Sequence, residues 1–201
     1  YDPFKGRISF DGHDLLSVPA HRIAELGIAR TFQNLALFPT MSLLENVMVG
    51  AHSQGSVGFV QAITRIGAQK ENRRIRDVSY DLLRDLNLEK LAHHPAAGLP
   101  FGTLKRLEIA RALAAAPRFL LLDEPAAGLT HSEVDELADT IVAIRDKFKL
   151  TVLLVEHHMS MVMKISDQVV AMEFGRKIAE GTPSEVQSDA NVIRAYLGGE
   201  V

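Results

Sequence analysis

The stretch that most constrains this chain runs from Phe119 to Leu129 and reads F-L-L-L-D-E-P-A-A-G-L. Its four consecutive apolar residues, Phe119 to Leu122, predict a strand buried on both faces, as in a parallel sheet. Asp123 and Glu124 follow directly, and ligands of open parallel sheets bind beyond the carboxyl ends of the strands. Asp123 can therefore hold a magnesium ion, and Glu124 can orient or activate a water molecule. The same pair of acids is also typical of a strand end that is merely solvated. The rest of the chain has to show whether Asp123 and Glu124 form a site.

Apolar strands alternate with amphipathic helices from Phe101 to Met172, which predicts an α/β fold with a parallel sheet. The helix that follows the central strand has a capping-box sequence, T-H-S-E, at its start. Residues 174–176 predict a hairpin turn that leads from the strand 168–172 into the strand 177–179, and two short helices, 183–188 and 190–197, close the chain. The other predicted strands are 7–10, 28–32, 151–155, 168–172 and 177–179, and the other predicted helices are 18–26, 101–115 and 161–165.

The interval from about Leu43 to Pro95 contains no convincing strand and predicts an inserted helical subdomain. Residues 43–49 form a short helix or an extended run, and 52–67 is Gly- and Ser-rich and predicts an irregular insert. Residues 70–88 predict an amphipathic helix with Ile75, Val78, Leu82 and Leu86 inward and its arginines on a solvated face. We expect a single domain over 1–201, with α/β core portions at 1–42 and 97–201, a helical subdomain at 43–96 and a C-terminal helical extension at 183–201.

Composition narrows the class of protein. The 201 residues suffice for one sizeable domain, and the absence of Cys excludes disulfides and thiolate metal sites. The formal net charge of -3 gives no basic field for nucleic acid. No apolar run approaches the roughly 20 residues that cross a bilayer. The chain begins Tyr1-Asp2-Pro3 without an initiator Met, which we interpret as N-terminal truncation.

Polar groups of a suitable kind follow three of the predicted strands: Gln33, the pair Asp123 and Glu124, and His157. An amide, two carboxylates and an imidazole at neighbouring strand ends can converge on a magnesium nucleotide. Gln33 can reach the metal and the attacking water, and His157 can donate to the terminal phosphate. Each residue alone is also typical of an ordinary surface position, and only their joint placement favours the site.

A second phosphate-directed element is Leu99-Pro100-Phe101-Gly102-Thr103, which immediately precedes a predicted helix. Free N–H groups at a helix start attract anions, and Gly102 allows close approach of the backbone. Many helices begin with Pro or Gly, so this signal is weak on its own.

Together these motifs resemble the nucleotide-binding subunits of ABC transporters, in order and over nearly the whole chain. R-T-F-Q-N at 30–34 resembles the Q-loop, residues 99–113 the signature and its helix, 119–124 Walker B, 126–130 the D-loop, and His157 the switch histidine. The resemblance implies a P-loop NTPase (RecA-like) core with ATP and Mg²⁺ as ligands. It implies catalytic roles for Glu124, His157 and Gln33 and metal binding by Asp123 and Gln33. It also implies contacts to a partner's ATP by the signature loop, which is Leu99, Pro100, Phe101, Gly102 and Thr103, and by Thr130 of the D-loop.

The subfamily is suggested by G-I-A-R-T-F-Q-N-L-A-L-F-P, V-E-H-H-M and the ending A-Y-L-G-G-E, which resemble the ATPase of branched-chain amino-acid importers. That resemblance implies a second ABC ATPase subunit, transmembrane permease subunits contacted by the helical insert and the Q-loop, and indirectly a periplasmic or extracellular binding protein. It implies a cytoplasmic place on the inner face of the membrane and no nucleic acid. The alternatives are a urea or lipid-related ABC transporter, an ABC ATPase acting on DNA or ribosomes, and a non-catalytic interaction protein.

Four departures from the family pattern stand out. Pro100 and Phe101 replace the Ser and first Gly of the usual L-S-G-G-Q, which removes a hydroxyl contact to phosphate. Thr130 stands where an Asp is common and can instead cap the next helix. His158 replaces an Asp after the switch histidine and receives no role. No G-x-x-x-x-G-K-[ST] occurs in the 201 residues, so we expect that the Walker A segment is missing and that these residues alone bind ATP weakly if at all.

Overall fold

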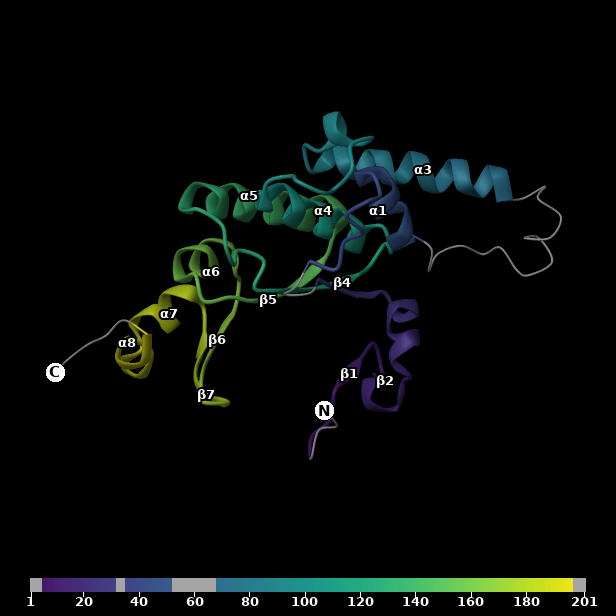
Figure 1. Cartoon of the computed structure of the whole chain (residues 1–201). Helices are drawn as coiled ribbons and strands as arrows, with labels where there is room; N and C mark the ends of the chain where they lie inside the picture. Colours follow the sequence, from purple (N-terminus) through teal and green to yellow (C-terminus); the bar gives the residue numbers. More distant parts are fainter. Residues whose placement is uncertain (1–4, 32–34, 52–67, 197–201) are drawn as a thin grey trace.

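The computed structural model describes residues 5–31, 35–51 and 68–196 (Figure 1). Its centre is a three-stranded parallel sheet in the order β3 (Ile28–Arg30), β4 (Phe119–Asp123) and β5 (Thr151–Val155). Ile28 pairs with Phe119, and Phe119 pairs in turn with Thr151. The α/β fold predicted from the sequence is therefore confirmed, with the central strand in the predicted position.

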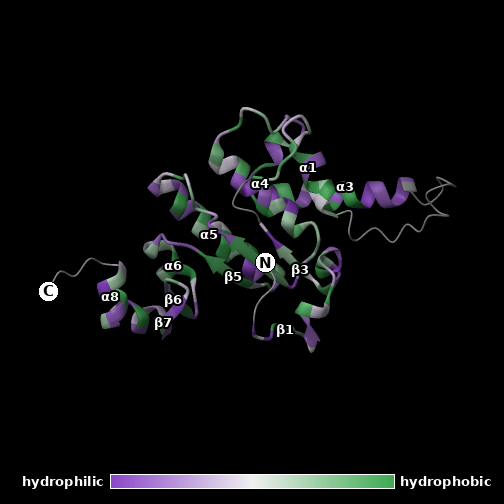
Figure 2. Cartoon of the chain, turned by 60° about the horizontal axis from the view of Figure 1, so that its bottom comes forward, coloured by the Kyte–Doolittle hydropathy of each residue, from purple (hydrophilic) through white to green (hydrophobic). Residues whose placement is uncertain are grey.

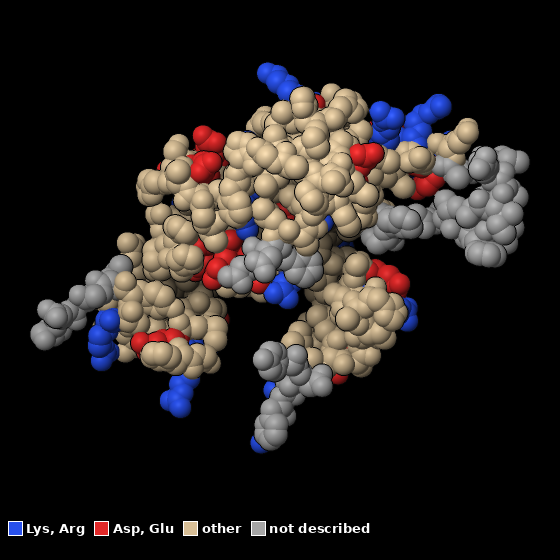
Figure 3. Space-filling view, in the orientation of Figure 1, with Lys and Arg blue, Asp and Glu red and all other residues tan. Residues whose placement is uncertain are grey.

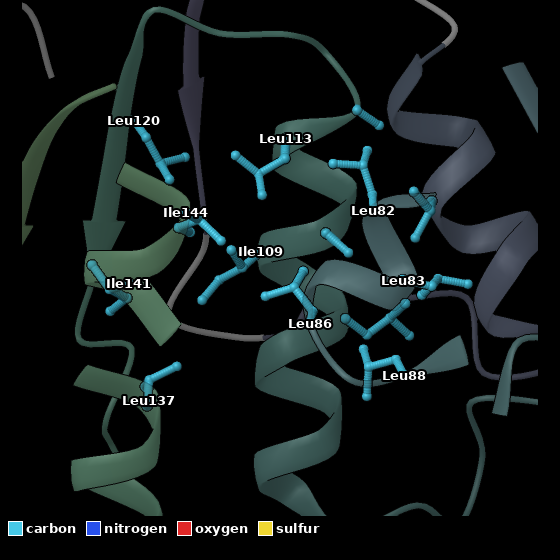
Figure 4. Close-up of a cluster of buried hydrophobic side chains, with 14 of the residues drawn as sticks. Leu82, Leu83, Leu86, Leu88, Ile109, Leu113, Leu120, Leu137, Ile141 and Ile144 are labelled. Carbon is cyan, nitrogen blue, oxygen red and sulfur yellow. The ribbon is translucent and has the colours of Figure 1, made fainter. Parts of the chain in front are cut away.

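The main hydrophobic core lies on the side of this sheet where α4 (Phe101–Leu113) and α5 (His131–Phe148) run (Figure 1). Alternate residues of β4, Leu120 and Leu122, are fully buried there, as the period of two in a strand requires. Figure 4 shows how side chains from the sheet and from several helices meet in this core, namely Leu82, Leu86, Ile109, Leu113, Leu120, Leu137, Ile141 and Ile144.

The opposite side of the sheet is only partly covered, contrary to the expected burial on both faces. Phe119 and Leu121 of β4 are half-buried, whereas Leu153 and Val155 of β5 are 49% and 54% exposed. Figure 2 shows β5 as a hydrophobic ribbon. An apolar run shows that both faces of a strand are hydrophobic, but it does not show whether each face is covered. In the described part of the chain only one face is buried.

The strand predicted at 168–172 exists, and the hairpin predicted between it and the strand at 177–179 is confirmed. The prediction that this strand belongs to the parallel sheet is wrong. β6 (Val169–Glu173) pairs antiparallel with β7 (Arg176–Gly181), and the predicted turn between them is formed by Phe174 and Gly175 at φ of 46° and 76°. A two-residue connection permits only antiparallel pairing. This small sheet packs with α6 (Met159–Ile165), α7 (Pro183–Ser188) and α8 (Ala190–Tyr196) around a second apolar cluster.

Two helices, α1 (Leu43–Gly50) and α3 (Ala68–Asp85), occupy the interval predicted to be helical, followed by the 3₁₀ turn Glu89–Leu91. The inward stripe of α3 differs from the prediction because Val78 is 45% exposed and Ser79 is buried instead. At 100° per residue, Val78 lies about 60° away from Ile75, whereas Ser79 and Leu82 stay within the stripe. The irregular insert expected at 52–67 lies outside the described residues.

The N-terminal part forms a small hairpin, β1 (Ser9–Phe10) and β2 (His13–Asp14), around a turn at Asp11 and Gly12. Two 3₁₀ helices follow, Leu15–Ser17 and Ala20–Leu26, and the second ends where predicted, at Gly27, whose φ of 83° suits glycine. Among the described residues, no helix is both long and apolar enough to cross a bilayer.

Candidate functional site at the carboxyl edge of the sheet

The carboxyl ends of β4 and β5 bring two groups of predicted site residues to the same edge of the sheet. Asp123 is paired with Val155, and the N–H of Glu124 donates to the Val155 carbonyl at 2.9 Å. Glu124 and His157 therefore follow adjacent ends of two hydrogen-bonded strands. Figure 3 shows acidic side chains near the middle of the molecule, above a hollow between its two lower lobes. The predicted convergence of these two strand ends is present.

Glu124 leaves the strand in a left-handed backbone conformation, with φ of 45°. This region is uncommon for residues other than glycine and is enriched at functional sites. The turn is fixed by the Ala127 N–H, which donates to the Glu124 carbonyl at 3.2 Å, and by the buried Pro125. The local backbone thus redirects the Glu124 side chain away from the alternation of β4.

Asp123 is the half-buried acid at the end of β4. Its Oδ2 accepts a hydrogen bond from Nη2 of Arg30 at 2.8 Å, and its own N–H donates to the Thr31 hydroxyl at 3.3 Å. A carboxylate that attracts a guanidinium and remains 30% exposed offers the hard oxygen ligand that Mg²⁺ prefers. Asp123 can therefore supply one oxygen ligand of the kind that Mg²⁺ prefers.

Thr31 continues the pairing of β3 beyond its assigned end, because its N–H donates to the Leu121 carbonyl at 2.9 Å. The chain of β3 thus leads toward the same edge as Asp123. Gln33, predicted as a metal and water ligand, lies outside the described residues.

His157 is exposed at 61% of its side chain, and its ring lies against that of His158, with 4.6 Å between ring centroids. Both histidines donate their backbone N–H groups to Oε2 of Glu156, at 2.9 and 3.2 Å. Nδ1 of His158 lies 2.9 Å from the same oxygen. Oε1 of Glu156 accepts the N–H of Ala126, from the turn after β4, at 2.7 Å.

Glu156 is a residue that the sequence reasoning missed, and its side chain is fully buried. Burial alone raises the pKa of this carboxyl, but the hydrogen bonds from His158 and from the N–H groups of Ala126, His158 and His157 outweigh it and hold the pKa below its ordinary value. A signal was present in the sequence, because Glu156 directly follows an apolar strand just as Asp123 does.

The signature loop, Leu99 to Thr103, forms the start of α4. Pro100 is the N-cap residue and provides no side-chain cap, so the first N–H groups of the helix lack intrahelical partners. Pro100 and Phe101 are exposed, Leu99 and Gly102 are half-buried, and Thr103 is buried. The hydrogen-bond donors available to a ligand at this end therefore belong to the backbone.

The start of α4 packs against the turn that follows Glu124. A Cβ added to Gly128, whose φ is 80°, would come within 3.2 Å of the Phe101 ring. A Cβ on Gly102 would come within 3.0 Å of Oε1 of Glu133 in α5. Gly102 and Gly128 thus allow the start of α4 to lie close to α5 and to the turn after Glu124. The signature loop and this turn, which are separate in the sequence, are therefore in contact.

Thr130 begins α5 as its N-cap and forms the predicted capping box with Glu133. The Thr130 hydroxyl accepts the Glu133 N–H, while the Glu133 carboxylate accepts from the N–H and the hydroxyl of Thr130 at 2.9 and 2.8 Å. These two bonds to Thr130 hold the pKa of Glu133 below its ordinary value. The prediction that Thr130 can cap the next helix is therefore confirmed.

Comparison with protein families matches residues 1–127 to the ABC transporter family and residues 176–201 to a family described as branched-chain amino acid ATP-binding cassette transporter. The chain is 40% identical over 199 residues to the high-affinity branched-chain amino acid transport ATP-binding protein BraF of Pseudomonas aeruginosa. It is 37% identical over 199 residues to LivG of Escherichia coli strain K12, which has the same description. Each match covers 98% of this chain and 78% of the relative.

The fold agrees with these matches. A solved structure of the ADP conformation of MJ1267, an ATP-binding cassette of an ABC transporter, superposes with a TM-score of 0.79 at 28% identity, covering 98% of this chain and 78% of that one. Sequence and fold lead to the same family, and the chain belongs to the ABC transporters as one of their ATP-binding, ATP-hydrolysing subunits.

Proposed function

We propose that this chain powers the import of branched-chain amino acids by hydrolysing ATP at the sheet edge formed by β4 and β5. The single observation that carries the catalytic part is the register of Asp123 with Val155, which places Glu124 and His157 at adjacent strand ends. The substrate is inferred from BraF and LivG, both described as branched-chain amino acid transport proteins, and from the match of residues 176–201.

Within this proposal the two acids have separate roles. Asp123 would hold Mg²⁺, and Glu124 would accept a proton from the attacking water. Bound Mg²⁺ would neutralise negative charge on the phosphates. His157, whose ring is exposed, donates to the terminal phosphate, and Gln33 contributes to the metal and the water.

The signature loop acts on the nucleotide of a second ATPase subunit. The uncapped N–H groups at the start of α4 carry partial positive charge and can donate to phosphate oxygens. Pro100 removes the hydroxyl that Ser supplies in the usual signature, so the backbone at Phe101, Gly102 and Thr103 provides this contact. Thr130 supports the adjacent turn as a cap, in addition to any contact across the subunit interface.

The permease subunits are inferred to bind the helical subdomain, residues 43–96, which is inserted between core portions 1–42 and 97–201. A cavity of about 600 Å³ lies there, lined by Leu44 and Met48 of α1, by Arg73 and Arg76 of α3, and by His93. A concave surface with apolar and charged walls suits a protruding segment of a partner protein. This docking would place the chain on the cytoplasmic face of the membrane.

The proposal is tested with Glu124→Gln in the natural protein that contains these 201 residues, assembled with its permease. Removal of a general base predicts a fall of about 10²- to 10⁴-fold in ATP hydrolysis. ATP-dependent uptake of labelled leucine should fall with it, while nucleotide binding persists because Gln keeps the shape of Glu.

Glu136→Gln provides the matched control, because Glu136 is an exposed acid on α5, away from the sheet edge. It should leave both activities unchanged. Unaltered hydrolysis in Glu124→Gln would reject the catalytic assignment. Hydrolysis stimulated by another solute, with no leucine uptake in the unmodified transporter, would reject the substrate.

A further inference from the structure

The Glu156 carboxylate connects two loops that the proposed ATPase site requires. Its side chain is fully buried, and four N–H groups are directed at its two oxygens. One donor, the Ala126 N–H, belongs to the turn after β4, and the other three belong to His157 and His158 after β5. Carboxylates buried in folded proteins are almost always hydrogen-bonded, and both oxygens of the Glu156 carboxylate accept hydrogen bonds.

His158 fixes the orientation of this carboxylate. Its Nδ1 lies 2.9 Å from Oε2 of Glu156, and because an ionised carboxylate only accepts, Nδ1 carries the proton. The same ring lies against the ring of His157. His158 thus touches both Glu156 and the residue proposed to donate to phosphate.

The contacts continue from Glu156 to the signature loop. Ala126, which Glu156 holds at 2.7 Å, lies two residues after Glu124 and two before Gly128, whose backbone supports the Phe101 ring. The switch histidine, the catalytic acid and the signature loop therefore meet through one short turn with Glu156 at its base.

A metal site is the alternative for these three residues, because ligand atoms of Glu156, His157 and His158 lie within 4.8 Å of one another. Oε2 of Glu156, however, already faces three N–H groups. A cation at that oxygen would meet the positive ends of these dipoles. The arrangement favours a structural carboxylate over a metal ligand.

We propose that Glu156, oriented by His158, is a positioning residue that holds the Glu124–Thr130 turn and His157 in register for ATP hydrolysis. This inference rests on the proposed function for its kinetic consequence but not for the hydrogen bonds themselves. It gives a role to His158, which departs from the family pattern at that position.

Hydrogen exchange tests the connection without reference to activity. In the natural protein that contains these residues, Glu156→Gln replaces Oε2 or Oε1 by an NH₂ group, which cannot accept an N–H bond. We expect amides of residues 126–130 and 156–158 to exchange about tenfold faster, with 43–50 unchanged. Unchanged exchange at 126–130 would overturn the proposal.

The two variants of His158 separate positioning from mere packing. In His158→Asn the side-chain NH₂ stands close to the place of Nδ1–H and keeps the bond to Glu156, whereas His158→Ala loses it. Exchange at 126–130 should rise in His158→Ala and stay near the original rate in His158→Asn. An equal rise in both variants would contradict the proposed orientation by His158.

Kinetics then test the functional consequence. Glu156→Gln and His158→Ala should lower kcat for ATP about tenfold with KM changed less than about twofold, and His158→Asn should recover most of kcat, because only alignment of the reacting groups is affected. A loss confined to KM would reject the positioning role. If Glu124→Gln retains full hydrolysis, the proposed function fails, while the exchange result still decides whether Glu156 joins the two loops.

Discussion

At the scale of residues, the ion pair between Arg30 and Asp123 brings a positive charge next to an acid of the sheet edge. The guanidinium lies 2.8 Å from the carboxylate that is proposed to hold Mg²⁺, and both side chains are accessible to water. An exposed ion pair of this kind contributes little to stability. The effect of the pair is therefore local, because the Arg30 guanidinium balances the negative charge of the Asp123 carboxylate.

Glu156 makes stability depend on pH. Because hydrogen bonds hold its pKa below the ordinary value of 4.5, the folded state favours the charged carboxylate, and this contribution is fully present above that value. It is lost as pH falls from about 4.5 through the lower pKa of the folded state.

We expect Glu156→Gln to reduce the dependence of unfolding free energy on pH in this acid range. Denaturant unfolding at a series of pH values between neutral and acid measures the difference between the two proteins, and Glu136→Gln serves as the control. Parallel curves for Glu156→Gln and the unmodified protein would contradict the assigned hydrogen bonds.

At the scale of elements, α5 begins with a capping box that also ends the turn after Glu124. Thr130 and Glu133 exchange three hydrogen bonds, and Thr182 and Glu185 repeat the arrangement at the start of α7. The first turn of α5 is thus fixed by side chains, and the glutamate is also a neighbour of Gly102 in the signature loop.

Thr130→Ala should lower the free energy of unfolding by about 1 kcal/mol through loss of the cap, and Thr130→Ser should retain most of it. Thr140→Ala, in the middle of the same helix, is the control and should change stability by less than about 0.5 kcal/mol. Chemical denaturation measures all three. A weaker nucleotide affinity with unaltered stability would instead favour a D-loop contact as the sole role of Thr130.

Elements whose signals are local were predictable from the sequence. The apolar run of β4, the stop at Gly27 and the Thr130 cap depend on residues within a few positions, and the structure has all three. Sequence order along a strand also sufficed to place Asp123, Glu124 and His157 at one edge. These predictions needed no knowledge of distant contacts.

Features that depend on distant partners were not predictable. Whether Leu153 is covered, or whether β6 also joins the parallel sheet beside β5, depends on which segments meet in space. Ser79 lies on the buried face of α3, and the more apolar Val78 does not, because the angle of each residue around the helix axis decides which side chains face the core. Glu156 was missed because its importance comes from Ala126, thirty residues earlier in the chain.

At the scale of the whole molecule, the sheet edge and the helical subdomain are joined through α4. Its start packs against the turn after Glu124, while the rest of its length contacts α1 and α3. A permease docked on the subdomain, as proposed above, would therefore have a direct packed route to the signature loop.

Arg76 lines the cavity of about 600 Å³ and a neighbouring one of about 450 Å³, as Leu44 and His93 do, and it brings a positive charge to both parts of the inferred docking surface. Arg76→Glu should reduce the permease that co-purifies with this subunit by about five- to tenfold, because reversed charge opposes a complementary partner. Arg74→Glu, on the same helix but outside both cavities, is the matched control. Equal recovery of permease with both variants would locate the docking surface elsewhere.

The partly uncovered β5 has a consequence for the colloidal behaviour of the protein. In the described part of the chain β5 is an outer strand of its sheet, and it carries the exposed Leu153 and Val155. Such a strand is a template on which a second molecule can add its own backbone. A concentrated preparation of these 201 residues alone will therefore tend toward edge-to-edge aggregation, and Leu153→Lys, which adds a charge at an exposed position, should keep it dispersed.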